Sequence, residues 1–400
     1  RAGRRLGLSL AILVASSSPL NQFIINHPEY FWGKSPEQAR INPDNPMVLI
    51  NHLKCAAFEL PFAEGEAFGG SDPTQMLKFL EEERVVHLSG GQWHWMSDSY
   101  PADQISLRSV SSDNFLVLDA SNENRTLAEV EFSDAPSTLH EKAIYLCEGA
   151  PYLVERMDYA GRRAYVKPVE VDYYTDAITY NHLRILDVFE REDLSRSRRA
   201  HGEVHVLEQV VGFKKIKFYT LENLGSGEVL LPEQEMHTTA YWLTIPRGLL
   251  QGLALSAAEV GNGLLGLAHA LQSVACLFLM SDPHDLATYI GDESLLDRPP
   301  ERPEGEALGS ASVLPSGPAF AVRPDFQPSL FLYDNYPGGI GLSPRLYQIH
   351  EELLRDTLKL IQSCPCRSGC PSCVGAIQEV GRGAKAATLS ILRAILGVVL

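Results

Sequence analysis

The chain has little positive charge and lacks the sequence with which P-loop proteins bind nucleotide phosphates. Its 34 lysines and arginines stand against 50 aspartates and glutamates, so its formal net charge at pH 7 is −16. That charge does not steer the chain as a whole toward DNA, and any nucleic-acid contact must depend on local basic patches. No G-x-x-x-x-G-K-[ST] sequence occurs in the 400 residues, which excludes a Walker A loop within them, and we find no internal repeat.

The charge is distributed unevenly along the chain. Residues 281–306 contain eight acidic residues and two arginines, a local charge of −6. Residues 345–393 contain seven basic and four acidic residues, a local charge of +3. A length of 400 residues favours two to three domains, and an apolar fraction of 45% is enough to build their cores.

Histidine is absent from the densest group of possible metal ligands, which consists of cysteines only. Four of the seven cysteines lie in the C-x-C-x3-C-x2-C sequence near the C-terminus: Cys364, Cys366, Cys370 and Cys373. Four thiolates at this spacing favour a closed, structural zinc site, and nothing suggests a catalytic metal with an open position. Two disulfides and an iron–sulfur cluster remain as alternatives. Cys55, Cys147 and Cys276 lie singly among apolar residues and are expected to be buried.

Two apolar segments allow a membrane or export interpretation. Residues 6–15 follow the basic sequence of residues 1–5, as in a signal peptide, but a buried strand over residues 8–14 is the favoured interpretation. The chain begins with Arg1 rather than methionine, so we interpret it as a fragment or a processed product. Residues 263–280 carry no formal charge and reach the length of a membrane span, although Gly263, Gly266, His269 and Gln272 favour a buried core helix.

The periodicity of apolar residues predicts several kinds of structure in succession. Residues 21–62 are helical with a proline-rich interruption at 42–46, and residues 73–96 form a helix followed by a β-hairpin, as at the end of a winged helix. Residues 103–220 are rich in short strands, predicted at 105–107, 115–118, 127–132, 143–146, 152–158 and 164–168, with a further hairpin formed by 204–211 and 213–220. Helices follow from residue 246. A strand at 329–333 leads through a glycine-rich turn into a further helix, and residues 291–326 form a flexible insertion.

Several segments allow a chemical role beside a structural one. The glycine-rich turn at 334–341 could bind phosphate through backbone amides or could simply need glycine for its geometry. The sequence at 196–199 is either a solvated loop or a phosphate contact. Asp282, His284 and Asp285 could bind a metal, although helix capping explains them more simply. His237 lacks a convincing catalytic partner. Core packing and base stacking are both open for the tryptophans, which include Trp93, Trp95 and Trp242.

Taken together, these features resemble one family, the superfamily 2 DEAD/DEAH-box DNA helicases of the MrfA type, whose C-terminal region carries a four-cysteine zinc domain. Residues 1–31 resemble the end of the second RecA-like domain. The other matching passages occur in order along the chain, at residues 35–46, 171–177, 231–240, 333–343 and 364–374.

The resemblance implies that Arg1 and Arg4 belong to helicase motif VI, whose arginines contact ATP phosphates. It implies a parent protein that is an ATP-dependent 3′→5′ DNA helicase in DNA repair, uses ATP and magnesium, and carries zinc as a structural staple. Because the Walker A and Asp-Glu-x-His motifs are missing, we expect this fragment to be inactive as an ATP hydrolase on its own. Its expected role is to guide or separate DNA strands.

We therefore predict a mixed, multidomain α+β fold. Residues 1–34 are the remnant of a RecA-like α/β domain, 35–102 a winged helix, 103–225 a β-rich connector, and 226–400 a mixed α/β zinc domain with the insertion at about 291–326. The expected partner is single-stranded or forked DNA, without a membrane, for a monomeric cytoplasmic protein. The alternative is a stand-alone, zinc-containing nucleic-acid-binding or scaffold protein. A secreted protein with two disulfides is a further rival.

Overall fold

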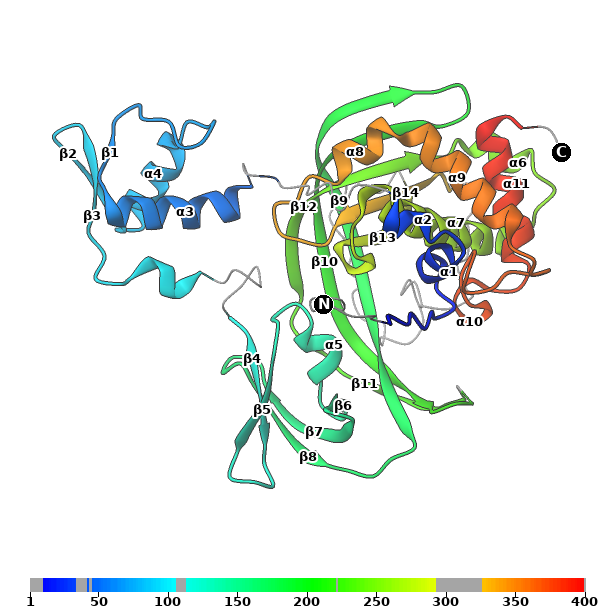
Figure 1. Ribbon diagram of the computed structural model, residues 1–400, viewed down its shortest axis with the longest axis horizontal. Helices are drawn as coiled ribbons and strands as arrows, with labels where there is room; N and C mark the ends of the chain where they lie inside the picture. Colours follow the sequence, from blue (N-terminus) through cyan, green and yellow to red (C-terminus); the bar gives the residue numbers. More distant parts are fainter. Residues whose placement is uncertain are drawn as a thin grey trace, which may run out of the picture.

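This computed structural model describes residues 10–33, 42, 45–105, 113–220, 222–292 and 326–398. The described residues form three sheets of three, five and six strands, each with its own hydrophobic core. Figure 1 shows the three-stranded part projecting away from the rest of the molecule, and the helices of the C-terminal half gathered beside the six-stranded sheet. The predicted α+β, multidomain fold class is confirmed.

The first described segment has no regular structure before two short helices begin. Ser18 caps α1 (Pro19–Asn26) by accepting a hydrogen bond from the Asn21 amide at 3.3 Å, and α2 (Glu29–Trp32) follows. The strand predicted at residues 8–14 is wrong over its described part, because residues 10–16 have no regular structure and Leu10 and Val14 are more than four-fifths exposed. A strand needs a neighbour to pair with, and no described strand lies beside this segment.

The winged-helix part folds around its own small core, as the helix-and-hairpin pattern predicts. Its elements are α3 (Pro46–Glu59), β1 (Phe62–Ala63), α4 (Thr74–Glu82), β2 (Val86–Ser89) and β3 (Gln92–Trp95), with strand order β1-β3-β2. The apolar positions of α3 recur at helical spacing, so Leu49, Leu53 and Ala57 face the sheet and bury against Trp93. A short 3₁₀ helix, η1 (Pro101–Gln104), follows the hairpin.

The connector is a five-stranded sheet with strand order β5-β4-β8-β7-β6. Its elements are β4 (Phe115–Asp119), β5 (Arg125–Val130), α5 (Ala135–Leu139), β6 (Ile144–Cys147), β7 (Ala150–Asp158) and β8 (Arg163–Pro168). The predicted strands at 115–118, 143–146, 152–158 and 164–168 are confirmed within one or two residues. β4 and β8 run parallel, whereas the other pairs are antiparallel.

The six-stranded sheet contains two very long strands. Its members are β9 (Tyr173–Asp193), β10 (Arg198–Lys217), β11 (Asn223–Glu228), β12 (Gln234–Thr244), β13 (Leu286–Asp292) and β14 (Pro328–Asp334). The predicted hairpin at 204–220 is wrong, because both halves belong to β10, which pairs with β9 along its length. Gly212, which separates the two predicted halves, lies at a β-bulge, where the register shifts and the strand continues. The sheet therefore joins strands from both sides of the predicted domain boundary at 225.

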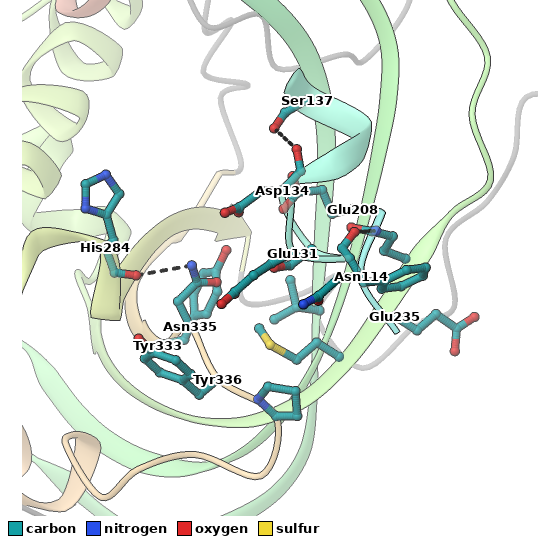
Figure 2. Close-up of a pocket in the computed structure, with 16 residues that line it drawn as sticks. Asn114, Glu131, Asp134, Ser137, Glu208, Glu235, His284, Tyr333, Asn335 and Tyr336 are labelled. Atoms are coloured by element: carbon teal, nitrogen blue, oxygen red, sulfur yellow. Dashed lines mark hydrogen bonds between the residues drawn. The ribbon is translucent and has the colours of Figure 1, made fainter. Parts of the chain in front are cut away.

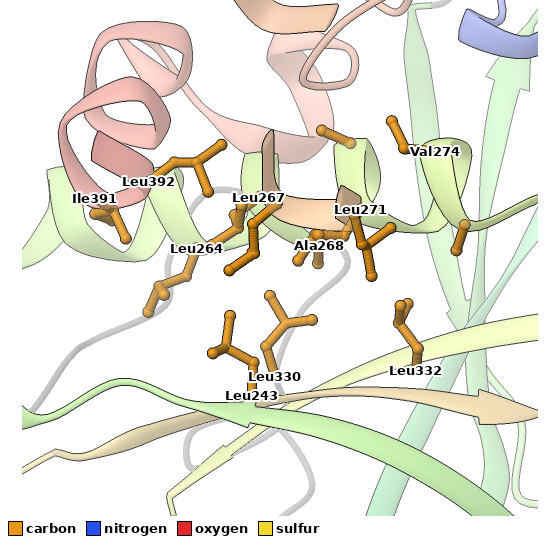
Figure 3. Close-up of a cluster of buried hydrophobic side chains, with 14 of the residues drawn as sticks. Leu243, Leu264, Leu267, Ala268, Leu271, Val274, Leu330, Leu332, Ile391 and Leu392 are labelled. Atoms are coloured by element: carbon orange, nitrogen blue, oxygen red, sulfur yellow. The ribbon is translucent and has the colours of Figure 1, made fainter. Parts of the chain in front are cut away.

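Helices cover one face of the six-stranded sheet and build the largest core of the chain. They are α6 (Arg247–Gln251), α7 (Ala257–Leu279), α8 (Ser343–Gln348), α9 (His350–Ser363), α10 (Ile377–Val380) and α11 (Ala384–Leu396), with a 3₁₀ turn η2 (Pro283–Asp285). Figure 3 shows leucines of α7 facing Leu243, Leu330 and Leu332 of the strands, while Ile391 and Leu392 of α11 join the same cluster.

The apolar helix α7 fits a core position better than a membrane span. By length and composition it is the one described helix that could cross a membrane, but 61% of its apolar window is buried inside the protein. Its glycines allow close helix packing, because a Cβ at Gly263 would lie 3.0 Å from Ala387 of α11. The Thr388 hydroxyl donates to the Gly263 carbonyl at 2.9 Å across the same contact. These contacts favour the predicted buried helix.

Candidate metal centre

Four cysteine thiols converge in the turn between α9 and α10. Their sulfur atoms all lie within 4.8 Å of one another. Cys364 Sγ is 3.5 Å from the sulfurs of Cys366 and Cys370, and Cys373 Sγ is 3.5 Å from that of Cys366 and 3.8 Å from that of Cys370. A tetrahedral zinc with Zn–S bonds of about 2.3 Å sets its sulfurs about 3.8 Å apart. The four thiols therefore fit a single zinc ion.

The same spacing disfavours the alternatives. A disulfide would bring two sulfurs to about 2.05 Å, and all seven cysteines of the chain are free. An iron–sulfur cluster places several iron and sulfide atoms between its thiolates, so its cysteines must stand farther apart than those around one ion. A closed four-thiolate site without an open position is structural rather than catalytic.

The ionisation of the thiols also calls for a bound cation. Burial raises the pKa of Cys373 and that of Cys364 above the ordinary thiol value. Burial opposes ionisation of Cys366 too, but hydrogen bonds from the other three thiols outweigh it and lower the pKa of Cys366 to about 7. Cys366 therefore ionises more readily than Cys364 and Cys373 near neutral pH. A divalent metal supplies the positive charge that lets all four act as thiolates.

A buried lysine stands beside the cluster. Lys385, in the first turn of α11, is 8% exposed. Its Nζ donates to the carbonyl oxygens of Cys364 and Cys366, both at 2.7 Å, and lies 3.5 Å from Cys366 Sγ. Four thiolates around Zn²⁺ leave a net charge of about −2, which a nearby ammonium group partly offsets. In the sequence, Lys385 is visible only as one of the basic residues of the tail, because it lies 12 or more residues from the cysteines and no local pattern indicates the contact.

Backbone geometry holds the cysteine turn in one shape. The Cys370 carbonyl accepts hydrogen bonds from the amides of Cys373, Val374 and Gly375 at 3.0, 3.2 and 3.2 Å. Gly369 has a φ of +113°, and a Cβ there would lie 2.7 Å from Val374 Cγ2, so only glycine fits this position. Val374 is fully buried in the main core, which ties the turn to the helices.

The cysteine turn also binds the N-terminal segment. The Ser372 hydroxyl donates to the Ser17 carbonyl at 2.6 Å, just before α1. The Tyr30 hydroxyl donates to the Leu277 carbonyl of α7 at 3.1 Å, so α2 is held on the same helix. Residues near the two ends of the chain thus share one structural unit, and Figure 1 shows α1 and α2 beside α7.

The glycine-rich turn after β14 is organised from within. Asp334 is fully buried, and its Oδ2 accepts the amides of Ile340, Gly341 and Leu342 at 2.7, 3.0 and 3.2 Å. Burial raises the pKa of Asp334 to about 6, although these three amides act in the opposite direction. The amides that could have bound a phosphate are therefore occupied by a carboxylate. The phosphate-binding alternative for this turn is wrong, and its role is structural.

The turn forms a socket for the residue that begins the winged helix. Asn45 is 3% exposed, and its Nδ2 donates to the carbonyls of Pro337 and Gly339, both at 2.9 Å. Its Oδ1 accepts the amide of Met47 at 2.9 Å and so caps α3. A Cβ at Gly338 would lie 2.6 Å from Asn45 Oδ1. Asn45 and residues 337–339, which belong to two of the passages that carried the family resemblance, therefore meet in space at this contact.

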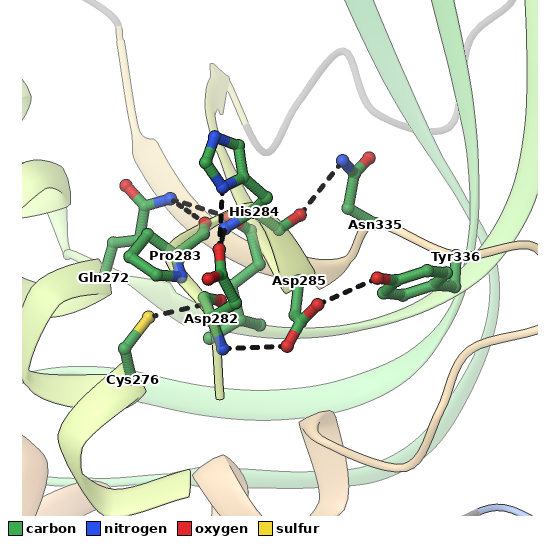
Figure 4. Close-up of polar contacts among 9 residues, drawn as sticks. Gln272, Cys276, Asp282, Pro283, His284, Asp285, Asn335 and Tyr336 are labelled. Carbon is green, nitrogen blue, oxygen red and sulfur yellow. Dashed lines mark hydrogen bonds and ion pairs between the residues drawn. The ribbon is translucent and has the colours of Figure 1, made fainter. Parts of the chain in front are cut away.

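The acidic residues before β13 form a cap, as the simpler interpretation predicts. Asp282 Oδ1 accepts the His284 amide at 2.9 Å, and Asp285 Oδ2 accepts the Asp282 amide at 2.8 Å, as Figure 4 shows. Asp285 Oδ1 accepts the Tyr336 hydroxyl at 2.9 Å. Among the described residues, only the four cysteines form a group able to hold a metal. The metal alternative for this segment is not supported.

One pocket of about 340 Å³ lies between the connector and the six-stranded sheet. Figure 2 shows four carboxylate side chains around it, those of Glu131, Asp134, Glu208 and Glu235. Burial, and to a smaller extent Asp134, raises the pKa of Glu208. Because like charges repel, this lining disfavours phosphate groups, and we assign the pocket neither to a nucleotide nor to DNA.

The remaining candidates have structural partners. Arg199 pairs with Glu192 at 2.5 Å, and Arg198 pairs with Asp193, so the basic sequence at 196–199 is largely used within the fold. The tryptophan side chains of the cores are Trp93 and Trp242, each 3% exposed. Trp95 Nε1 donates to Ser97 O at 2.7 Å, and His237 Nδ1 lies 3.9 Å from Glu203 Oε1 without forming a catalytic pair. Arg1 and Arg4 lie outside the described residues.

Two models of known protein families match separate parts of the chain. A family model described as the MrfA Zn-binding domain matches residues 267–374, which include all four cysteines of the site. A second model, the winged helix domain of "ATP-dependent helicase HRQ1", matches residues 41–110. Zinc binding by the four-cysteine site is thus supported by its geometry and by this family model.

Longer alignments extend over nearly the whole chain. It is 40% identical over 394 residues to "Uncharacterized ATP-dependent helicase YprA" of Bacillus subtilis, which covers 98% of this chain and 48% of that protein. It is 28% identical over 395 residues to ATP-dependent helicase HRQ1 of Saccharomyces cerevisiae, covering 94% of this chain and 34% of that protein. The chain therefore spans less than half the length of these curated relatives.

Solved structures are also similar to nearly the whole chain. The crystal structure of the DUF1998 helicase MrfA bound to DNA is 38% identical, with a TM-score of 0.54, over 97% of this chain and 48% of that one. A further crystal structure of the DUF1998 helicase MrfA is 32% identical, with a TM-score of 0.61, over 99% of this chain and 50% of that one.

Proposed function

Because this chain corresponds to the C-terminal region of the MrfA-type helicases, we propose that it is the accessory region of an ATP-dependent DNA helicase. The observation that carries the proposal is the 40% identity to one such helicase over 98% of the chain. In this role the chain lies along DNA beside the motor and guides or separates the strands. The zinc ion keeps the last helices and the segment before α1 in one fixed arrangement.

The finer parts of the proposal concern the whole parent protein. We propose that it hydrolyses ATP with magnesium, moves 3′→5′ on DNA, and acts in DNA repair as a monomer in the cytoplasm. The resemblance of residues 1–5 to motif VI supports an ATP-phosphate role for Arg1 and Arg4. Since the 400 residues contain no Walker A loop, we expect no ATP hydrolysis from this chain alone.

DNA contact in this proposal depends on local basic side chains near the zinc site. Arg367 lies within the cysteine turn, and Arg382 lies just before α11. Both are exposed, and within the described part of the chain neither forms an ion pair. By contrast, Arg355 of the same basic tail pairs with Glu351 at 3.6 Å. Exposed arginines without a carboxylate partner are suited to phosphate oxygens.

DNA binding by the full 400-residue chain tests the proposal. We expect fluorescence anisotropy to show binding of single-stranded and forked DNA that weakens steeply with salt. The double variant Arg367→Ala and Arg382→Ala should reduce the slope of log K against log salt by about 1.4 to 1.8, corresponding to two lost phosphate contacts. The matched control is Arg355→Ala, which should leave the slope unchanged.

Two results would contradict the proposal. One is that the zinc-loaded chain binds neither single-stranded nor forked DNA at low salt. The other is binding that the double variant and the control weaken equally, which would mean that the arginines beside the zinc site make no specific phosphate contact. ATP hydrolysis by the chain alone would contradict the assignment of the motor to the missing part of the parent.

A further inference from the structure

The winged-helix part has an unexpected charge for a module of a DNA helicase. Residues 45–104 carry nine acidic residues and three basic ones, Lys54, Lys78 and Arg84, which gives a net charge of −6. Proteins that contact the DNA backbone depend on lysine and arginine to neutralise phosphates. A net charge of −6 works against the association of this domain with a phosphate backbone.

The two elements with which winged helices usually approach DNA also lack suitable side chains. The tip of the wing between β2 and β3 consists of Ser89, Gly90, Gly91 and Gln92, without a charged or aromatic residue. On α4, Lys78 is the only basic residue, and Glu81 and Glu82 follow it in the next turn. The wing tip therefore offers no lysine or arginine, and α4 offers a single lysine, for the phosphate contacts that position a recognition helix on a duplex.

An exposed apolar surface lies elsewhere on this domain, where α3 ends and β3 leads into η1. We call it the aromatic patch and define it by Phe58, Trp95, Met96 and Tyr100. Phe58, Met96 and Tyr100 are 44%, 53% and 54% exposed. The Phe58 ring packs edge-on against those of Trp95 and Tyr100, with centroid distances of 5.8 and 5.3 Å. Trp95 has its N–H satisfied by Ser97 O, so its ring contributes an apolar surface.

Acidic residues adjoin this patch in the sequence. Glu59 follows Phe58, Asp98 lies between Met96 and Tyr100, and Asp103 lies on η1, which contacts α3. Lys54 lies one helical turn before Phe58 and only partly offsets these charges. Rigid aromatic side chains that are exposed together and adjoined by charge are typical of a protein-binding surface.

We propose that the aromatic patch docks a segment of a partner protein in which apolar side chains are flanked by lysine or arginine. The apolar side chains cover Phe58, Met96 and Tyr100, and the basic ones pair with the adjoining carboxylates. Single-stranded DNA could also stack on these rings, but its phosphates would then lie beside Glu59 and Asp98. The winged helix is thus a recruiting surface, and DNA contact falls to other parts of the protein.

The test uses the full chain with a defined probe. The probe is a short fluorescent peptide that alternates lysine with leucine and phenylalanine. Two matched peptides replace either its lysines by glutamate or its apolar residues by serine, and both should bind at least tenfold more weakly. On the protein side, Phe58→Ser should weaken binding of the probe about tenfold. Phe79→Ser is the matched control, since Phe79 is 49% exposed on α4 of the same domain, outside the patch.

A charge-reversal variant keeps the test valid if Phe58→Ser perturbs folding. The double variant Glu59→Lys and Asp98→Lys should weaken binding of the lysine peptide about tenfold and strengthen binding of the glutamate peptide. Equal binding of the probe to the patch variants and to Phe79→Ser would overturn the proposal. So would loss of single-stranded DNA binding in the patch variants with peptide binding unchanged, because the patch would then be a DNA surface. The DNA affinity set by Arg367 and Arg382 should not respond to these variants.

Discussion

Replacing Lys385 with methionine removes the ammonium group beside the four thiols and keeps a side chain of similar length. The lost interactions are the two hydrogen bonds of 2.7 Å to the carbonyls of Cys364 and Cys366. Hydrogen bonds from a charged group contribute about 1.5 to 3 kcal/mol each, or about 3 to 6 kcal/mol together. An apolar side chain avoids the cost of burying an ammonium group, which reduces the net loss to about 2 kcal/mol.

A loss of about 2 kcal/mol corresponds to roughly thirtyfold weaker zinc retention if it acts wholly on the metal. The assay is the rate of zinc release to a chromogenic chelator, together with zinc content by elemental analysis and the melting temperature. Lys359→Met is the matched control, because Lys359 lies on α9 with a side chain that is 76% exposed. If Lys385→Met released zinc at the rate of the control and melted at the same temperature, the role assigned to Lys385 would be refuted.

Three further predictions concern the zinc site, the glycine-rich turn and the contact of Asn45, at the start of α3, with that turn. Cys370→Ser should abolish the zinc site and unfold at least the chain beyond Arg345, since structural zinc contributes about 10 to 16 kcal/mol in small peptides; limited proteolysis checks this, and protection equal to wild type would exclude a structural role for zinc. Burial raises the pKa of Asp334 in the folded protein to about 6, above its unfolded pKa of about 4. Its contribution to the free energy of unfolding is therefore fully present below about pH 4 and is lost as the pH rises through 6. Denaturation of Asp334→Asn, whose amide oxygen still accepts the three backbone amides, should lack this loss of about 3 kcal/mol between pH 4 and 7, and an unchanged pH profile would contradict the raised pKa. Asn45→Ala removes two hydrogen bonds to the turn and the cap of α3, about 2 kcal/mol in all; small-angle scattering should show the winged helix farther from the body, and an unaltered profile would mean that other contacts set its position.

The sequence predicted the zinc site well because its chemistry is local. The four cysteines lie within ten residues, so their spacing alone restricts the coordination geometry, and Gly369 is needed at the one strained position among them. The winged helix was recognisable for a similar reason, since its helix and hairpin are consecutive and show clean periodicity in α4, β2 and β3. Features that depend on neighbours in the chain are visible in a single sequence.

Features that depend on distant residues were missed or misinterpreted. The bulge at Gly212 resembles a turn in the sequence, and only pairing with β9 shows that β10 continues through it. The glycine-rich turn could be a phosphate loop until Asp334 is seen to occupy its amides. The contacts of Lys385 with the cysteine turn and of Asn45 with the glycine-rich turn have no sequence signal, because nothing in the local pattern records which backbone carbonyl a side chain will reach.

The most direct test of the account is strand separation by the full-length parent protein, measured on a forked DNA beside its DNA-stimulated ATP hydrolysis. In the proposed division of labour, ATP hydrolysis belongs to the motor and strand guidance to the region with the zinc site. We therefore expect the parent carrying Cys370→Ser to retain most of its ATP hydrolysis and to lose strand separation by tenfold or more. Strand separation at the wild-type rate in that variant, with zinc absent by elemental analysis, would contradict the claim that this region is the zinc-fixed accessory part of a DNA helicase.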